Sequence, residues 1–300
     1  MKILPALGLA ICLAVAAAAA CHPSSGQDLK TDVYLSADST AHSSLSIKAE
    51  LPLPGQGAAA ERIRAALIQV MDVQMSHIGT YEEDRLFPAF NGGSDDTQAL
   101  MEYYRSKSLE IIGQFSQEDF DERVKTIKEE EGLTEDEMEE ILAGMPGLEY
   151  DFSLLKNRET DRYVIFLSED YFYLGGAHGG ITGCGGLTFD KKDGHLVERF
   201  LELSSLKALQ PLLRKGLADY FTADGEQVTP DTLDDFLFLE SGIIPFPAWT
   251  PFPSEDGLVF TYQQYEIAAY AAGMPSFTLP YDDILPYLTT EAKELLGLSE

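Results

Sequence analysis

The stretch of this sequence whose residue types could do chemistry is a glycine-rich run that holds one histidine. Residues 175–186 read GGAHGGITGCGG, with His178 near the start. Glycine permits positive φ and close backbone approach, so two interpretations remain open: a tight bulged turn between strands, or an exposed loop that presents His178 and backbone amides to a ligand. The run is neither a phosphate loop nor a dinucleotide fingerprint, because it lacks a Gly-Lys-Ser/Thr ending and has a different glycine spacing.

Other chemistry-bearing residues stand alone. No two of the five histidines are four residues apart, as helical metal ligands would be: these are His22, His42, His77, His178 and His195. Ser204 and Lys207 match Ser-x-x-Lys, but the companion motifs are absent and Ser204 is expected to cap a helix. We therefore predict no catalytic residue, no metal site and no cofactor, and we expect that the protein is not an enzyme.

One aromatic segment also attracts interest. Residues 246–253 read FPAWTPFP and contain the only tryptophan of the chain. An extended segment of aromatic rings and prolines could bind a sugar or a peptide at a sheet edge. More commonly, such a segment forms a loop that packs its rings across a sheet.

The elements around these residues predict an α+β fold, with an antiparallel sheet packed against helices. Strands are expected from alternating or β-branched and aromatic residues, at 46–54, 148–157, 162–174, 187–190, 195–203, 258–265 and 276–279. Helices are expected from apolar spacing and capping signals, at 58–78, 96–115, 117–131, 134–144, 204–221, 282–288 and 290–296. Thr134 and Glu137 form a capping-box pattern.

The composition is strongly acidic. There are 21 Lys and Arg against 50 Asp and Glu, a formal charge of −29, while 45% of residues are hydrophobic. This charge repels phosphate backbones, so it excludes nucleic acid as a partner, and the hydrophobic content is that of a globular protein. Residues 117–140 alone hold 12 acids and 3 bases. This acidic helical insert is either a solvated helical pair or a contact surface for a basic partner.

The first 21 residues have the pattern of an export signal. Lys2 precedes an apolar run over residues 3–20, which ends in small residues before Cys21. A basic start, a short apolar core and small terminal residues are typical of secretory signals, and Ala18-Ala19-Ala20-Cys21 is similar to the bacterial lipoprotein box. We expect cleavage after residue 20, lipidation of Cys21 and a tether within residues 21–45. A lipoprotein of this kind lies in the bacterial cell envelope, periplasmic or surface-exposed, anchored to the inner or outer membrane.

Two distant stretches carry a family resemblance. Residues 171–180 read YFYLGGAHGG, and residues 257–273 read GLVFTYQQYEIAAYAAG. Together they resemble the extracytoplasmic domain shared by the lysozyme-sensing anti-sigma factor RsiV and the N-terminal module of the peptidoglycan deacetylase PdaC. The resemblance implies one α+β module. Residues 46–147 would form its N-terminal strand–helix half, with the acidic insert, and residues 148–300 its C-terminal half.

The resemblance also implies a function, which is non-catalytic binding of a lysozyme-like protein or of peptidoglycan. It places a candidate binding face at Tyr171, Tyr173, Gly175, Gly176, His178, Gly179, Tyr265, Glu266 and Tyr270. The His-x-x-x-His metal motif of the deacetylase domain is absent from the sequence, so deacetylation is not implied. The acidic charge favours a basic protein partner. Two alternatives stay open: an envelope hydrolase that uses His178, and a scaffold of an envelope assembly that uses residues 117–140.

Overall fold

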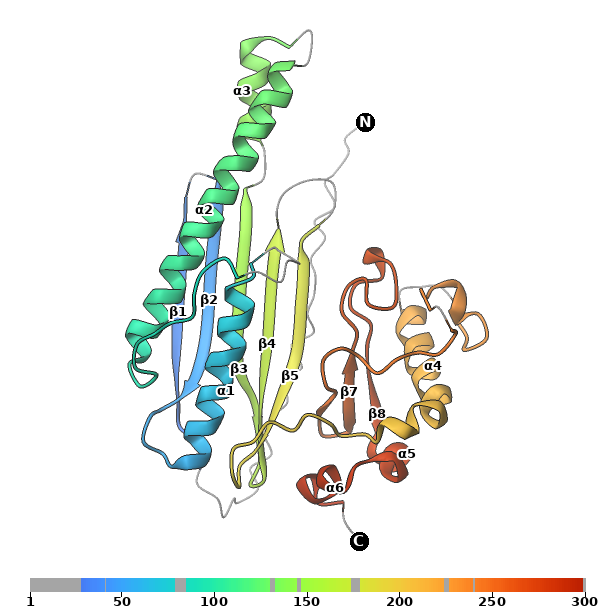
Figure 1. Cartoon of the computed structure of the whole chain (residues 1–300). Helices are drawn as coiled ribbons and strands as arrows, with labels where there is room; N and C mark the ends of the chain where they lie inside the picture. Colours follow the sequence, from blue (N-terminus) through green and yellow to red (C-terminus); the bar gives the residue numbers. More distant parts are fainter. Residues whose placement is uncertain are drawn as a thin grey trace.

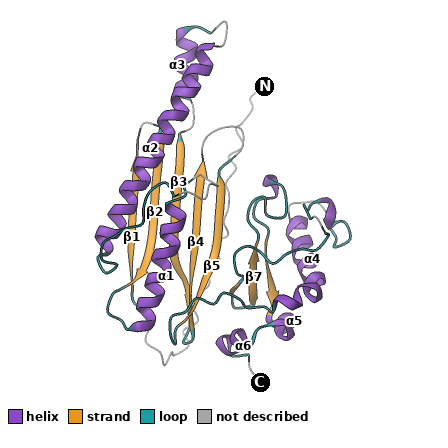
Figure 2. Cartoon of the chain, viewed as in Figure 1, coloured by secondary structure: helices purple, strands orange, loops and turns teal. Residues whose placement is uncertain are grey.

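The computed structural model describes residues 28–40, 42–78, 85–129, 133–144, 147–173, 179–223, 227–239 and 241–298. The expected signal peptide and Cys21 lie outside the described residues. A five-stranded sheet, a three-stranded sheet and the helices packed on them give the α+β class that the sequence predicts (Figure 1, Figure 2). None of the helices within the described ranges is long and apolar enough to cross a bilayer.

The five-stranded sheet carries the segments of interest. Its strands lie in the order β1 (Thr31–Ser39), β2 (Ser43–Pro52), β3 (Leu148–Glu159), β4 (Tyr163–Tyr173) and β5 (Ile181–Asp190). Three pairings are antiparallel, whereas β2 and β3 run parallel. The parallel pair follows from the connection, because all the helices between these two strands form one crossover.

Strand β1 differs from the prediction. Residues 31–39, expected as part of the tether, pair along their whole length with β2, from Thr31 opposite Pro52 to Ser39 opposite Ser44. The strand is polar and contributes little to the core, since Val33 and Leu35 are exposed. Its backbone hydrogen bonds to β2 therefore hold it at the sheet edge.

Three helices follow β2 along the chain: α1 (Ala58–Met75), α2 (Thr97–Glu129) and α3 (Glu135–Ala143). The first two cover one face of the sheet (Figure 1). Apolar side chains of α1 and α2 share one core cluster with side chains from that face, including Ile63, Leu67, Met71, Leu100, Tyr104, Ile112, Leu45, Ile47, Tyr150 and Phe152. The helix pattern of α1 is thus confirmed.

Helix α2 is one continuous helix, so the prediction of two helices at 96–115 and 117–131 is wrong. Gly113 and Ser116 lie inside it, and neither ends it. The Ser116 hydroxyl donates a hydrogen bond to the His42 carbonyl at 2.8 Å, which ties α2 to the loop before β2. The capping box of α3 is confirmed, with Thr134 and Glu137 bonding each other's backbone amides.

A buried arginine fixes the start of the helical layer. Arg64 of α1 is 2% exposed, and its guanidinium donates to the carbonyl of Pro52 at 2.7 Å and to the Thr97 hydroxyl at 2.8 Å. It also donates to the carbonyl of Ser94. Burial lowers the pKa of Arg64 from its ordinary value. These bonds join the end of β2 to the beginning of α2.

The C-terminal part builds a second core. Helix α4 (Leu206–Ala223), with Pro211 inside it, packs on the three-stranded sheet of β6 (Phe252–Pro253), β7 (Gly257–Thr261) and β8 (Ser276–Pro280). Helices α5 (Tyr281–Ile284) and α6 (Thr290–Leu296) close the chain. The strand expected at 195–203 is wrong, because that segment makes only single bridges at Leu196 and Leu201.

Candidate functional site

Two segments that carry the predicted site meet at the N-terminal end of β5. The Tyr270 hydroxyl donates a hydrogen bond to the carbonyl of Gly180 at 2.8 Å. The rings of Tyr265 and Tyr270 have centroids 5.7 Å apart. Residues 90 positions apart in the chain thus form one surface. We call Tyr171, Tyr173, Gly179, Tyr265 and Tyr270 the tyrosine face.

The glycines of this surface are required by the rings that lie on them. A Cβ at residue 179 would come within 2.3 Å of the Tyr270 hydroxyl oxygen, and a Cβ at residue 180 within 2.1 Å of the Tyr171 ring. Real Cβ atoms do not approach neighbours so closely. Glycine at 179 and 180 therefore lets two tyrosines pack directly on the backbone, which is the close approach that its missing side chain allows.

Tyr265 is the most exposed tyrosine of the tyrosine face. The residue is 54% exposed, and its φ of 65° is the one positive value among non-glycine residues in the described part of the chain. A left-handed backbone costs an L-residue about 1–2 kcal/mol, and such strain gathers at functional sites. The backbone conformation and the exposure together mark Tyr265 as the centre of the candidate site.

Glu266, the other predicted residue of this segment, has a structural role. Its carboxylate accepts hydrogen bonds from the backbone amides of Ala248 at 2.7 Å and Gln263 at 2.8 Å. Both oxygens are thus engaged by the chain. The side chain of Glu266 therefore holds the turn that carries Tyr265.

Two glutamines anchor the same segment to β5. Gln263 accepts from the amide of Cys184 and donates to its carbonyl, at 2.9 and 2.8 Å. Gln264 accepts from the amide of Thr182 at 2.8 Å. These side chains form hydrogen bonds with backbone groups on the outer edge of β5, as a further strand would. They thus fix the position of Tyr265 and Tyr270 beside Tyr171.

Acidic residues adjoin the tyrosine face, and the sequence analysis missed them. Asp151 of β3 lies opposite Tyr171, and Glu149 lies opposite Tyr173. Directly opposed residues have Cβ atoms about 5 Å apart on one face of a sheet. Burial raises the pKa of Glu149 and of Asp151. Burial, and then the negative charge of Glu149, raises the pKa of Tyr171.

These acids lie on the sheet face opposite the helices. Side chains alternate along β3, so Tyr150 and Phe152 point to the core under α1, while Glu149 and Asp151 point the other way. The alternation of acidic and aromatic residues in 149–152 was the signal available in the sequence. It could not be used without the pairing that sets Glu149 and Asp151 beside the tyrosines.

The rest of the glycine-rich run belongs to β5 and is packed. Trp249 lies against Gly185 and Phe252 against Gly186. Residues 246–253 therefore pack across the sheet, which was one of the two interpretations, although the last two of them form β6. Gly175, Gly176 and His178 lie outside the described residues, so their place relative to the tyrosine face is not given.

Comparisons with known proteins show what this chain is similar to. Residues 202–282 match the family described as "Protein of unknown function (DUF3298)". This range runs from the start of α4 through β7 and β8 and includes Tyr265 and Tyr270. No curated protein matches the sequence.

Two solved structures share the fold over most of the chain. A DUF3298 family member from Bacteroides fragilis is 17% identical, covers 90% of this chain and 97% of its own, and has a TM-score of 0.64. A DUF3298 family protein from Pseudomonas aeruginosa is 14% identical, covers 89% and 97%, and has a TM-score of 0.52. The chain thus has the α+β fold of solved DUF3298 proteins, and its residues 202–282 match the DUF3298 family.

Proposed function

We propose that this chain is a non-catalytic recognition module of the bacterial cell envelope, anchored by a lipid on Cys21, which binds a basic, lysozyme-like protein through the tyrosine face. The observation that carries the proposal is Tyr265, an exposed ring on a left-handed backbone, held beside Tyr270 and close to the sheet face that bears Glu149 and Asp151. The resemblance of the two tyrosine segments to the RsiV and PdaC domain supports it.

Tyrosine and acid together suit a basic protein surface. Tyrosines are enriched among the residues that carry most of the binding energy in protein interfaces. The reason is that the ring buries apolar area while the hydroxyl forms hydrogen bonds. The carboxylates of Glu149 and Asp151 attract Lys and Arg side chains of a partner. The net charge of −29 adds long-range steering, which raises association rates and weakens with salt.

Peptidoglycan is the second candidate ligand, and the exposed Tyr265 ring favours it, since aromatic rings stack on sugar rings. The carboxylates of the wall would, however, meet Glu149 and Asp151 with like charge. Charge on the same face therefore ranks a basic protein above the wall polymer.

A binding experiment tests the choice. The mature chain, residues 21–300, is immobilised, and its affinity for lysozyme and for purified wall sacculi is measured at low and high salt. We expect lysozyme to bind, with weaker binding at high salt. Tyr265→Asn, which keeps a residue tolerant of positive φ, should weaken binding about tenfold, a loss common for interface tyrosines.

The matched control is Leu203→Asn, because Leu203 is also an exposed apolar residue, 60% exposed, and lies in the short turn of helix before α4. It should leave the affinity unchanged. Equal affinity of both variants, or no retention of lysozyme, would contradict the proposal, and retention of sacculi alone would replace the ligand with peptidoglycan. Release of soluble wall fragments on incubation with sacculi would show that the protein is a hydrolase.

A further inference from the structure

An acidic helical arm projects from the body of the molecule. The arm consists of residues 117–129 of α2 and of α3 (Glu135–Ala143). Past Ser116, which bonds to the His42 carbonyl, only Ile127 of α2 is buried. The 13 residues from 117 to 129 rise about 20 Å, and α2 with α3 extends beyond the ends of the strands (Figure 1).

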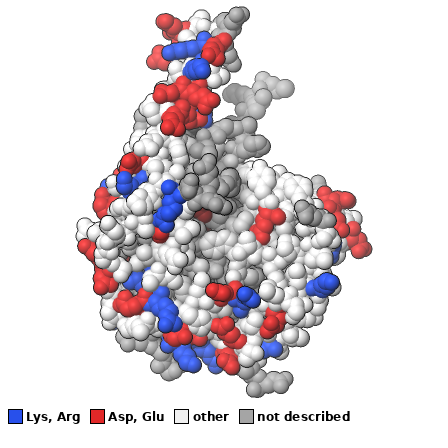
Figure 3. Space-filling view, viewed as in Figure 1, with Lys and Arg blue, Asp and Glu red and all other residues white. Residues whose placement is uncertain are grey.

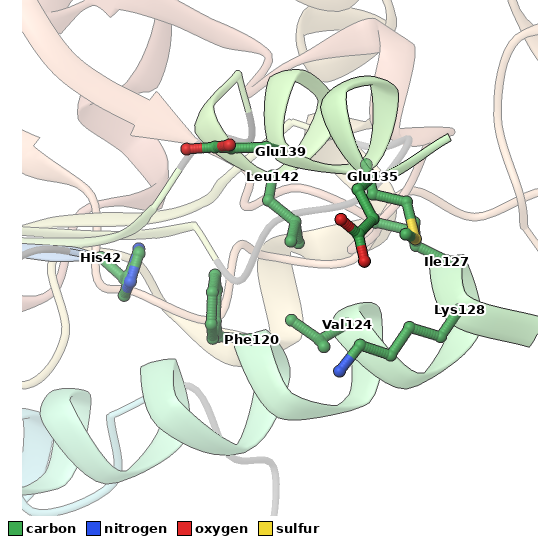
Figure 4. Close-up of a pocket in the computed structure, with 9 residues that line it drawn as sticks. His42, Phe120, Val124, Ile127, Lys128, Glu135, Glu139 and Leu142 are labelled. Carbon is green, nitrogen blue, oxygen red and sulfur yellow. The ribbon is translucent and has the colours of Figure 1, made fainter. Parts of the chain in front are cut away.

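An apolar groove runs between the two helices of the arm. The groove has a volume of about 490 Å³, within the range of about 300–1,000 Å³ typical of ligand sites. It is lined by His42, Phe120, Val124, Ile127, Lys128, Glu135, Met138, Glu139 and Leu142. In Figure 4 the side chains of Phe120, Val124 and Leu142 point into the space between the two helices.

The spacing of the apolar residues shows how the groove forms. Phe120, Val124 and Ile127 are four and three residues apart, so they share one stripe of α2. Met138 and Leu142, four apart, form the facing stripe of α3. His42 closes one end, with its ring stacked on Phe120 at 4.3 Å and 18°.

Charge around the groove selects its occupant. The described residues of the arm include ten acids and three bases, and Glu135 and Glu139 are themselves lining residues, with Lys128 as the lining base. Figure 3 shows acidic side chains over the projecting helices, with basic side chains among them. An anionic peptide or lipid would be repelled here, while a peptide with Lys or Arg beside apolar anchors would be attracted.

We propose that this groove binds a basic amphipathic helix of a partner protein. Two or three apolar side chains of the partner, spaced three or four residues apart, enter between the stripes of α2 and α3. Lys and Arg on the flanks of the same helix pair with Glu135 and Glu139. The groove uses no residue of the tyrosine face, so this second interaction is independent of the proposed function.

The test uses a synthetic helical peptide of Leu and Lys in amphipathic spacing, with a scrambled peptide of the same composition as its control. Fluorescence anisotropy should show binding of the amphipathic peptide and at least tenfold weaker binding of the scrambled one. Leu142→Glu should reduce the affinity at least tenfold. This substitution adds negative charge, so a merely electrostatic attraction to the cationic peptide would become stronger instead.

A second variant keeps the result independent of folding defects. Glu135→Gln with Glu139→Gln changes only exposed side chains, and it should weaken binding about threefold to tenfold and reduce its salt dependence. The matched control, Asp282→Asn with Asp283→Asn, removes two exposed acids of α5, at the opposite end of the molecule from α3 (Figure 1), and should have no effect.

Three outcomes would overturn the proposal: equal binding of amphipathic and scrambled peptides, unchanged binding by Leu142→Glu, or self-association of the chain that Leu142→Glu abolishes in sedimentation experiments. Tyr265→Asn should leave peptide binding unchanged, and Leu142→Glu should leave lysozyme binding unchanged. The two proposals can thus fail separately.

Discussion

The indole of Trp249 lies so close to Gly185 that a Cβ at residue 185 would come within 1.8 Å of its Cε3 atom. Similarly, a Cβ at residue 186 would come within 2.4 Å of the Phe252 ring. Through these two contacts the segment before β7, which includes β6, packs on β5. The two sheets are joined there, and the segment that carries Tyr265 and Tyr270 is held against the first sheet.

Gly185→Ala should therefore destabilise the protein by about 1–3 kcal/mol, as expected when a methyl group is forced into packed surroundings. Gly93→Ala is the matched control, because a Cβ there has no neighbour within 4 Å. Urea unfolding of both variants measures the difference. Equal midpoints for the two would show that Trp249 does not rest on Gly185.

The left-handed backbone of Tyr265 can be tested without its ring. Tyr265→Asn and Tyr265→Val both remove the aromatic contact with Tyr270. Asparagine tolerates a φ near 65°, whereas a β-branched residue is strained there. We expect the asparagine variant to be more stable than the valine variant by about 1–2 kcal/mol in thermal or urea unfolding. The reverse order would contradict the observed conformation.

The contribution of His195 to stability should depend on pH. Its ring nitrogens bond Asp193 and Glu291 of α6, and the hydrogen bond to Asp193, followed by that to Glu291, raises the pKa of His195. The folded pKa then exceeds the unfolded value of about 6.5, so the stabilisation is complete below pH 6.5 and is lost as pH rises through the folded pKa.

His195→Gln should accordingly lower the free energy of unfolding at pH 6 and have less effect at high pH. Because the His195 side chain is 35% exposed, solvent screening limits the loss to less than about 1 kcal/mol. Unfolding curves of both proteins across this pH range provide the measurement. A difference that stays constant with pH would rule out the ion pairs as its source.

Replacement of Asp170 should stabilise the protein, in contrast to the replacement of His195. Burial, and then the charge of Glu169, raises the pKa of Asp170 to about 6, and its carboxylate accepts from Gln74 Nε2 at 3.4 Å. Between pH 3.8 and 6 the folded state binds the proton more tightly than the unfolded state. Stability therefore falls as pH rises through this window.

Asp170→Asn removes the buried charge and keeps the oxygen that Gln74 contacts. It should raise the free energy of unfolding by about 1–3 kcal/mol at pH 7, with almost no change at pH 4. Denaturant titrations at the two pH values test this. A variant that is less stable at pH 7 would mean that the carboxylate contributes a bond which the amide cannot replace.

Local patterns predicted much of the fold because they depend on neighbouring residues alone. The apolar period of α1, the capping box of α3 and the strand pattern of β2 all survive in the structure. The polar strand β1 was missed, since its backbone bonds to β2 fix it and no apolar stripe marks it. The break expected near residue 116 is absent, because neither Gly113 nor Ser116 provides a helix stop.

Some residues of the candidate site could likewise be predicted from the sequence, and others could not. The tyrosine-rich segments were visible in the chain, and Tyr171 and Tyr270 both contact Gly180. Glu266 was expected on the binding face but bonds to backbone amides. Glu149 and Asp151 were overlooked, because only the register of β3 against β4 sets them beside Tyr173 and Tyr171.

Amino-acid order was thus sufficient for most of the elements, the acidic charge and the identity of the rings and glycines, since these follow from residue type and near spacing. Three features could be seen only in the folded chain. They are the packing of Tyr171 and Tyr270 on Gly180, the packing of Trp249 on Gly185, and the groove between α2 and α3. Such contacts join residues tens of positions apart, and the sheet register and helix packing that create them depend on the whole core at once.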